Sequence, residues 1–131
     1  MSADEIEGVR RTLALYCQLM DDGHHDEAVD LFDDDGCWTI QGATHQGINE
    51  IREMLSSMPL LESVKHVTTN SVIDIDGEVA TAVSDFLVVR ASDIGGVVLR
   101  AGRYHDSLRR SSSGRWKFVT RENRGTSFVS G

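Results

Sequence analysis

The stretch Lys65-His66-Val67-Thr68-Thr69-Asn70 marks the point at which the hydrophobic pattern of this 131-residue chain changes. Before Pro59 the apolar residues recur at the helical spacing of about 3.6, and after it they alternate with a period of about 2, which is typical of strands. The quoted stretch opens the strand half and carries one histidine among β-branched and polar residues. It therefore divides the chain into a helical first part and a following sheet, and His66 becomes the first candidate for chemistry.

The residues before this stretch predict three helices and one short strand. The first helix is amphipathic, because its apolar side chains share one face: Val9, Leu13, Tyr16, Cys17 and Met20. Gly23 follows where a left-handed C-terminal cap would lie. In chain order, the expected helices cover Asp4–Asp22, Asp26–Phe32 and Ile48–Met58, and a turn at Asp33–Gly36 and a strand at Cys37–Ile40 come between the second and the third.

The residues after this stretch predict a meander of strands, at His66–Ile75, Val79–Arg90, Val97–Arg109 and Trp116–Arg121. Short turns such as Asp76-Gly77 join them, so that neighbours pair antiparallel. Strands of about 12 residues span roughly 40 Å, which lets a sheet curl and leave a hollow beneath helices. The sequence therefore predicts an α+β fold in one domain over residues 1–131, with three N-terminal helices on a strongly curved, mainly antiparallel sheet that forms a cone-shaped pocket.

Charge and composition exclude several classes of partner. The net charge of −8 repels nucleic-acid phosphates and anionic lipids, so we expect neither as a partner. We expect no membrane span, because no run approaches about 18 apolar residues, and the acidic N-terminus does not resemble a secretory signal. A cytoplasmic location and free thiols at Cys17 and Cys37 follow as expectations.

Two clusters imitate metal sites without meeting the requirements of one. His24, His25 and Asp26 are adjacent, so they point apart at a helix start, and no third partner has ligand spacing. Asp33-Asp34-Asp35-Gly36 imitates the opening of a calcium loop, but Thr44 occupies the position that requires a glutamate. We therefore expect neither a metal nor a cofactor.

Asp21 is a candidate partner for His66. It lies at the C-terminal end of the first helix, where the helix dipole disfavours a carboxylate, which indicates a role other than stability. Histidine exchanges protons near neutral pH, and a carboxylate on one ring nitrogen fixes its tautomer. Tyr16 is a candidate hydrogen-bond donor to a carbonyl or enolate oxygen, although it lies about 140° from Asp21 around the helix.

Each candidate also has an ordinary structural interpretation. His66 would be a histidine at a strand end that bonds to the backbone. Asp21 would be a solvated charge at a helix end, and Tyr16 would be a core residue. Alternation along the strand places Thr68, Asn70 and Val72 on the face of His66, where Thr68 and Asn70 are expected to form a polar pocket wall. Two aromatic positions are left open: Trp38 fits the core or the pocket wall, and His105 lines the pocket or faces a partner subunit.

The order of the elements, together with particular motifs, resembles the SnoaL-like branch of the NTF2-like superfamily. The motifs are LYCQLMDDGHHDEAVDLF, which contains Tyr16 and Asp21, then CWTIQGATHQG, KHVTTN and AGRYHDSLRRSSSGRWKF. This branch includes lyases such as scytalone dehydratase, bile acid 7α-dehydratase and hexachlorocyclohexane dehydrochlorinase. The resemblance implies that His66 and Asp21 match a working histidine and aspartate, that Tyr16 matches the tyrosine of the bile acid dehydratase, and that Arg121 matches an arginine of some members. The dehydrochlorinase carries a basic residue in place of Tyr16, which favours dehydration here.

The expected function is cofactor-independent, dehydratase-type elimination on a small hydrophobic hydroxylated or cyclic molecule. His66 would be the base, Asp21 would orient it and Tyr16 would donate a hydrogen bond, with substrate contacts from Trp38, Thr68, Asn70, His105 and Arg121. An acid–base isomerase, a polyketide-cyclase-like enzyme and a non-catalytic binding or structural subunit are the alternatives. Apolar residues on both faces of the strand around Val83–Val89 predict a homodimer or homotrimer.

Overall fold

The computed structural model describes residues 1–127, which form three helices on one open sheet of six strands. The helices are α1 (Ala3–Asp21), α2 (His25–Val29) and α3 (Gly47–Ser57). The strands are β1 (Phe32–Ile40), β2 (Ala43–Gln46), β3 (Val64–Asp76), β4 (Val79–Ser92), β5 (Gly95–Arg110) and β6 (Trp116–Gly125). No helix within this range has the length and apolar character that crossing a bilayer requires.

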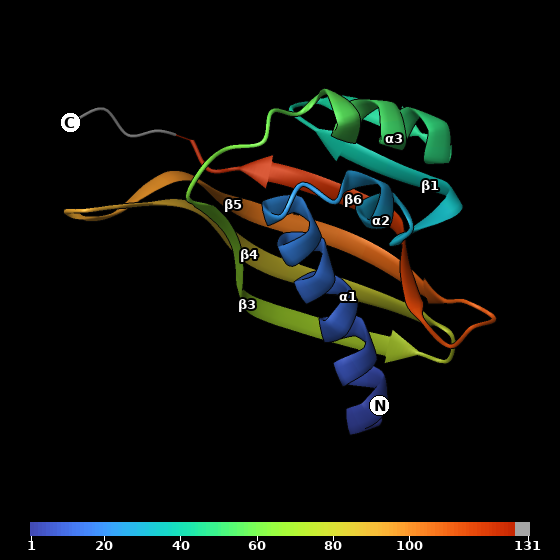
Figure 1. Ribbon diagram of the computed structural model, residues 1–131. Helices are drawn as coiled ribbons and strands as arrows, with labels where there is room; N and C mark the ends of the chain where they lie inside the picture. The colour runs from blue at the N-terminus through green and yellow to red at the C-terminus, as the bar shows by residue number, and fades with distance from the viewer. Residues whose placement is uncertain (128–131) are drawn as a thin grey trace.

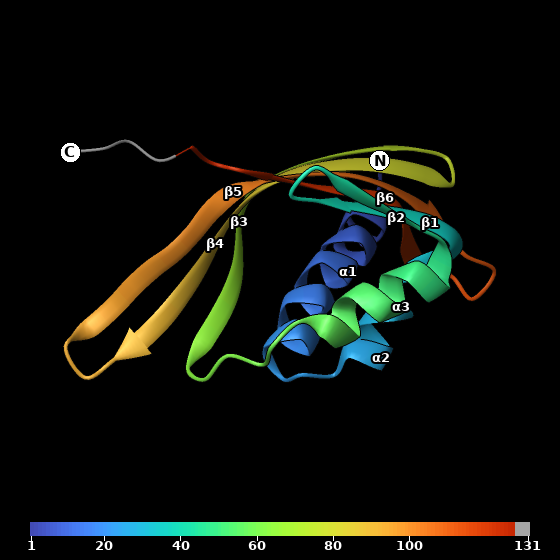
Figure 2. The same cartoon turned by 90° about the horizontal axis from the view of Figure 1, so that it is seen from above.

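The strands are ordered β2-β1-β6-β5-β4-β3, and all neighbours are antiparallel except β1 and β6, which are parallel. All three helices lie on the same face of the sheet (Figure 1). From above, the sheet bends over them, and the hairpin of β4 and β5 extends beyond the helices (Figure 2). The α+β prediction and the antiparallel meander β3 to β6 are confirmed, but in the described residues the curved sheet does not close into a barrel.

The core forms between the apolar face of α1 and the inner face of the sheet. The predicted stripe of α1 is buried from Val9 to Met20, and Ile51 and Leu55 of α3 are fully buried as well. The sheet contributes its large side chains from the strands that face the helices: Phe32, Trp38, Phe86, Tyr104, Leu108 and Phe118. Each buried side chain of this size contributes about 1.5–3 kcal/mol. This packing holds the end of α1 against β3.

Residues 30–36 differ from the prediction. Helix α2 ends at Val29, and β1 begins at Phe32, where a helix was expected to continue. The expected turn Asp33–Gly36 is part of β1, with an irregular register against β6 between Phe32 and Cys37. The cause is non-local, because Phe32 is fully buried and pairs with Phe118 of β6, and this burial outweighs the turn preference of the aspartates.

Strand β2 has no counterpart in the prediction. It pairs antiparallel with β1 at the edge of the sheet and is mostly exposed. Because it buries little, its residues carry no alternation of apolar and polar side chains that a sequence pattern could reveal. Its turn brings the chain back from β1 into α3, which then packs over the first strands.

Candidate active site

The C-terminus of α1 fixes the position of Asp21. Gly23 adopts φ 74° just past the helix, and two backbone hydrogen bonds close the end: His24 N–H to the Leu19 carbonyl (2.9 Å) and Gly23 N–H to the Met20 carbonyl (3.3 Å). This pattern is a Schellman motif, which requires the left-handed conformation that glycine adopts without strain. The predicted cap at Gly23 is therefore confirmed, and it holds the last helical residue, Asp21, against β3.

Asp21 and His66 are in direct contact. Oδ1 of Asp21 accepts a hydrogen bond from the backbone N–H of His66 at 2.8 Å and lies 2.7 Å from Nδ1 of its ring. An ionised carboxylate only accepts hydrogen bonds, which assigns the proton to Nδ1 and leaves Nε2 of the neutral ring as an acceptor. The Asp21 side chain is 6% exposed and that of His66 is 25% exposed. The pair is thus sheltered but open on the side of the histidine.

The pair lines a cavity of about 320 Å³ that fits the size range of small-molecule sites. Most of its wall is apolar, from α1, β1, α3, the segment after α3, β3 and β4: Met20, Ile40, Met54, Met58, Leu60, Leu61, Val64 and Val88. Asp21 and His66 also border a more open and more polar groove between α1 and β3, which includes Arg10, Gln18 and Lys65. The pair therefore lies between an apolar cavity and a polar groove that reaches solvent.

Tyr16 lies deeper than this cavity. It is 2% exposed and sits one helical turn before Met20, which lines the cavity, whereas Tyr16 is not among the described residues of the wall. Its ring meets those of Tyr104 and Phe118 edge-on at 6.0 and 6.2 Å. Burial raises the pKa of Tyr16 to about 12, so its phenol is neutral at physiological pH and is able to donate a hydrogen bond.

Arg121 and Asp106 form a buried ion pair in the same deep layer. Nε of Arg121 lies 3.6 Å from Oδ1 of Asp106, and both side chains are 0% exposed. The guanidinium lies over the rings of Tyr16, Tyr104 and Phe118 at 4.1, 3.6 and 4.5 Å from their centroids. In the described structure, none of the nitrogens of this guanidinium and neither oxygen of Asp106 has a hydrogen-bond partner. Burial raises the pKa of Asp106 to about 6, although Arg121 opposes the rise.

Trp38 belongs to this deep layer too. It is fully buried, pairs with Arg121 across β1 and β6, and its Nε1–H donates to Oδ1 of Asn123 at 3.3 Å. Its neighbour two residues on, Ile40, lines the cavity. Of the two interpretations left open for Trp38, the core is therefore the observed one.

Asn70 does not share the face of His66, so this expectation is wrong. The register between β3 and β4 shifts between Thr68 and Ser71, which turns both Thr69 and Asn70 outward. Thr68 stays inside, where its Oγ1 lies 3.2 Å from Sγ of Cys17 and borders the polar groove. After the irregularity Ser71 returns to the inner side and borders the same groove as Thr68.

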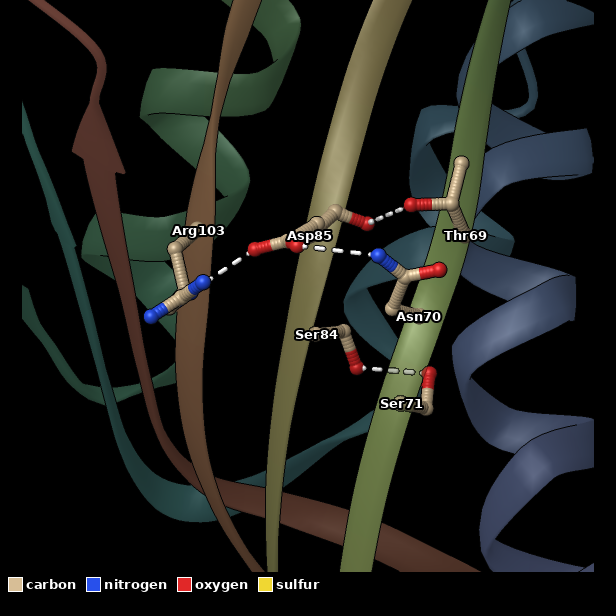
Figure 3. A network of polar contacts seen from close by, with 6 residues as sticks. All are labelled: Thr69, Asn70, Ser71, Ser84, Asp85 and Arg103. Atoms are coloured by element: carbon tan, nitrogen blue, oxygen red, sulfur yellow. Dashed lines mark hydrogen bonds and ion pairs between the residues drawn. The ribbon is translucent and has the colours of Figure 1, made fainter.

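On the outer face Asn70 joins a polar network that spans three strands (Figure 3). Nδ2 of Asn70 donates to Oδ2 of Asp85 at 3.2 Å, and Nε of Arg103 donates to Oδ1 at 2.7 Å. His105 lies on the same outer face of β5, opposite Val83 and Glu122. His105 is thus placed away from the cavity, in the outward position of the two that the sequence left open.

Two charged residues of the inner face were not predicted. Asp106 alternates with Tyr104 and Leu108 along β5, and this alternation identifies it as inward-facing once the strand is assigned. Arg100 lines the cavity, although the residue is exposed. No three His, Cys, Asp or Glu side chains of residues 1–127 converge in a way that suits a metal ion.

Comparison with known proteins places the chain in a family. The model of the SnoaL-like domain matches residues 1–122. A solved structure of the Rv3472 protein of Mycobacterium tuberculosis, whose function is unknown, is 26% identical, with a TM-score of 0.88 over 98% of this chain and 80% of that chain. No curated protein matches the sequence.

Two more distant structures show the fold alone. A candidate scytalone dehydratase from Novosphingobium aromaticivorans is 22% identical, with a TM-score of 0.79 over 94% of this chain and 85% of that chain. ActVI-ORFA from Streptomyces coelicolor is 16% identical, with a TM-score of 0.82 over 94% of this chain and 98% of that chain. Because the family model covers nearly the whole chain, the protein belongs to the SnoaL-like domain family.

Proposed function

We propose that this protein is a cofactor-independent lyase that eliminates water from a small hydrophobic hydroxylated or cyclic molecule. The observation that supports this proposal is the contact between Asp21 and His66 at the wall of an apolar cavity. The contact occupies Nδ1 of the ring and leaves Nε2 as the only ring nitrogen able to exchange a proton with a ligand. The apolar wall excludes water from a ligand and so strengthens the effect of each polar group.

In the proposed reaction Nε2 of His66 removes a proton from the carbon next to a carbonyl group. The electron pair of the broken C–H bond forms a C=C bond as the C–O bond of the hydroxyl group breaks, and the imidazolium returns its proton to the leaving oxygen, which departs as water. The carboxylate of Asp21 stabilises the imidazolium between these two steps. The histidine thus ends the cycle as it began, and no redox partner is required.

Tyr16 and Arg121 supply the polar floor in this proposal. The neutral phenol and the guanidinium are donors toward which the carbonyl oxygen of a ligand would point as negative charge develops on it. Neither lines the cavity as it stands, whereas Met20, one helical turn from Tyr16, does line it, and its unbranched side chain is able to repack. Trp38 packs in the same deep layer as Arg121, and Thr68 borders the groove that His66 also lines.

The main alternative is an acid–base isomerase or a polyketide-cyclase-like enzyme. The same base would return its proton to a different carbon or promote ring closure, without loss of a hydroxyl group. Structures of the fold include proteins named as different as a candidate scytalone dehydratase and ActVI-ORFA. A ligand-binding protein without turnover is the third possibility, and the release of water distinguishes the first function from both others.

The test is an activity screen with β-hydroxy ketones and hydroxylated rings. The reaction is monitored by the absorbance of the new conjugated double bond. His66→Gln is expected to lower kcat by about 10²–10⁴-fold, the usual contribution of a general base. His24→Gln is the control, because His24 is an exposed neighbour of the site that contacts Glu27 rather than Asp21. Turnover that is equal in His66→Gln and wild type would exclude His66 as the base.

We also propose that the protein forms a homodimer or homotrimer through the outer face of its sheet. Large apolar side chains are exposed there on β3 and β4, including Val67 at 39%, Val72 at 65% and Val79 at 53%. Light scattering should give the mass of two or three chains, and Val72→Glu should shift it toward one chain because a buried charge opposes association. A monomeric wild type would exclude this arrangement.

A further inference from the structure

Arg100 lies on the inner face of β5, at the last position before a register irregularity of this strand. Val88 of β4 pairs with Arg100, but the following Val89 pairs with Val98, so that Leu99 is the extra residue. Val88 is buried and lines the cavity, and a residue opposite it in the ladder shares its face. Arg100 therefore continues the inner face of β5 that Tyr104 and Asp106 occupy further along.

The charge of Arg100 is not neutralised by the described part of the protein. The other three arginines of β5 each pair with a carboxylate: Arg103 with Asp85, Arg109 with Asp33 and Arg110 with Glu78. Arg100 is in none of the ion pairs of residues 1–127, and the one carboxylate in the cavity wall, Asp21, is engaged by His66. The cavity thus contains an arginine whose hydrogen-bond donors are available to a ligand.

Arg100 is an exposed residue, but its surroundings differ from those of an ordinary surface arginine. It belongs to the wall of the cavity, together with the apolar side chains that would enclose a ligand. Its charge also acts inward: burial raises the pKa of Tyr16, and Arg100 is among the charges that oppose this rise. In a protein of net charge −8, the general field disfavours anions, so only a local cation would select one.

We propose that Arg100 binds a carboxylate group of the ligand, so that the ligand is a small hydrophobic acid. Guanidinium and carboxylate groups match each other with two parallel hydrogen bonds, which favours this anion over a neutral group. The apolar part of the acid would fill the cavity between Val88 and Met54, and its other polar end would face His66. The statement that this other end is the reacting end rests on the proposed function, whereas the charge preference does not.

The test is a competition experiment with the full chain and two probes of equal shape. 2-Naphthoate is anionic at pH 7 and 2-naphthamide is neutral, and each displaces N-phenyl-1-naphthylamine, an uncharged dye that fluoresces in apolar cavities. Wild type should prefer the anion by about tenfold, the usual effect of one hydrogen-bonded charge. Arg100→Met should lose this preference and still bind the dye. Arg90→Met is the matched control, because Arg90 is exposed on the same hairpin but outside the cavity wall.

Several outcomes would overturn the proposal. Equal displacement by both probes in wild type would show that no charge is recognised, and absence of dye binding would show that the cavity takes no such ligand. If Arg90→Met lost the preference for the anion as fully as Arg100→Met, the preference would come from the overall charge of the protein and not from Arg100. If Arg100→Met does not fold, the preference of wild type and its decrease from 20 mM to 500 mM salt decide the question. Neither probe undergoes a reaction, so this experiment tests ligand binding alone. Its failure would not exclude His66 as the base, and failure of His66 as the base would not exclude binding by Arg100.

Discussion

Removal of the Asp21 carboxylate should destabilise the protein by about 2–3 kcal/mol. Oδ1 of Asp21 accepts from the backbone N–H of His66 and from its ring, at 2.8 and 2.7 Å. Hydrogen bonds to a charged group contribute about 1.5–3 kcal/mol each, and the lower value applies because both share one oxygen, which gives about 3 kcal/mol. Loss of a negative charge at a helix C-terminus returns about 0.3–1 kcal/mol, so the net loss in Asp21→Ala is about 2–3 kcal/mol.

The assay is urea unfolding of Asp21→Ala beside two reference variants at pH 7. With a slope of about 1.5 kcal/mol per molar urea, the expected loss moves the midpoint down by roughly 1–2 M. Asp22→Ala is the matched control, because Asp22 is exposed at the same helix end and should lose only its unfavourable interaction with the dipole. Asp21→Asn keeps an acceptor for the backbone N–H but not the charge, and should fall between the two.

The reasoning would be refuted if the unfolding free energies of Asp21→Ala and Asp22→Ala agreed within about 0.5 kcal/mol, the usual range of surface substitutions. That result would mean that the carboxylate of Asp21 is solvated and that His66 is not oriented by it. If Asp21→Ala lost stability but kept the turnover rate of wild type, the contact between Asp21 and His66 would exist but would serve stability and not catalysis.

Three further results are expected. Arg121→Met alone should destabilise the fold by about 3–5 kcal/mol, because it leaves a buried carboxylate unpaired. In urea unfolding the double variant Arg121→Met/Asp106→Leu should recover most of this lost stability. Equal losses in the single and the double variant would contradict this expectation. The pKa of Asp106 is raised from 3.8 to about 6, so as pH falls the native state binds a proton at this group before the unfolded state does. The contribution of this group to stability therefore grows by roughly 3 kcal/mol as pH falls from 7 to 4. Asp106→Asn should lack this component of the pH profile of unfolding. Gly102→Ala should cost about 1–3 kcal/mol, because the new methyl group meets the backbone carbonyl oxygen of Arg124 and, at 2.7 Å, the ring of Phe86. Gly125→Ala, opposite it in β6 with open space, should leave the melting temperature nearly unchanged.

The part of the fold that depends on neighbouring residues could be predicted from the sequence. The period of 2 and the short turns fix strands β3 to β6 and their antiparallel order, and the apolar stripe fixes α1. The parallel pairing of β1 with β6 joins residues about 80 apart, so no local pattern reports it. The same pairing recruits the aspartates of Asp33–Gly36 into a strand against their turn preference.

The candidate site was predictable only where the strands are regular. His66 and Thr68 face inward as alternation predicts, but the irregularity after Thr68 turns Asn70 outward. The sequence gives no sign of this shift, because Thr68, Thr69, Asn70 and Ser71 are all polar and any register satisfies them equally. The inward positions of Arg100 and Asp106 were not predicted either, because a charged residue in a strand is ordinarily expected on the solvent side.

The position of β6 within the sheet also bears on how the protein folds during synthesis. This strand is the last of the six to leave the ribosome, yet it lies between β1 and β5 and joins the two parts of the sheet. Until Trp116–Gly125 emerges, β1 and β5 each present an unpaired edge, and Arg121 is not yet available to Asp106. The nascent chain therefore carries two separate sheet fragments until β6 unites them, and the core closes only once this strand is available.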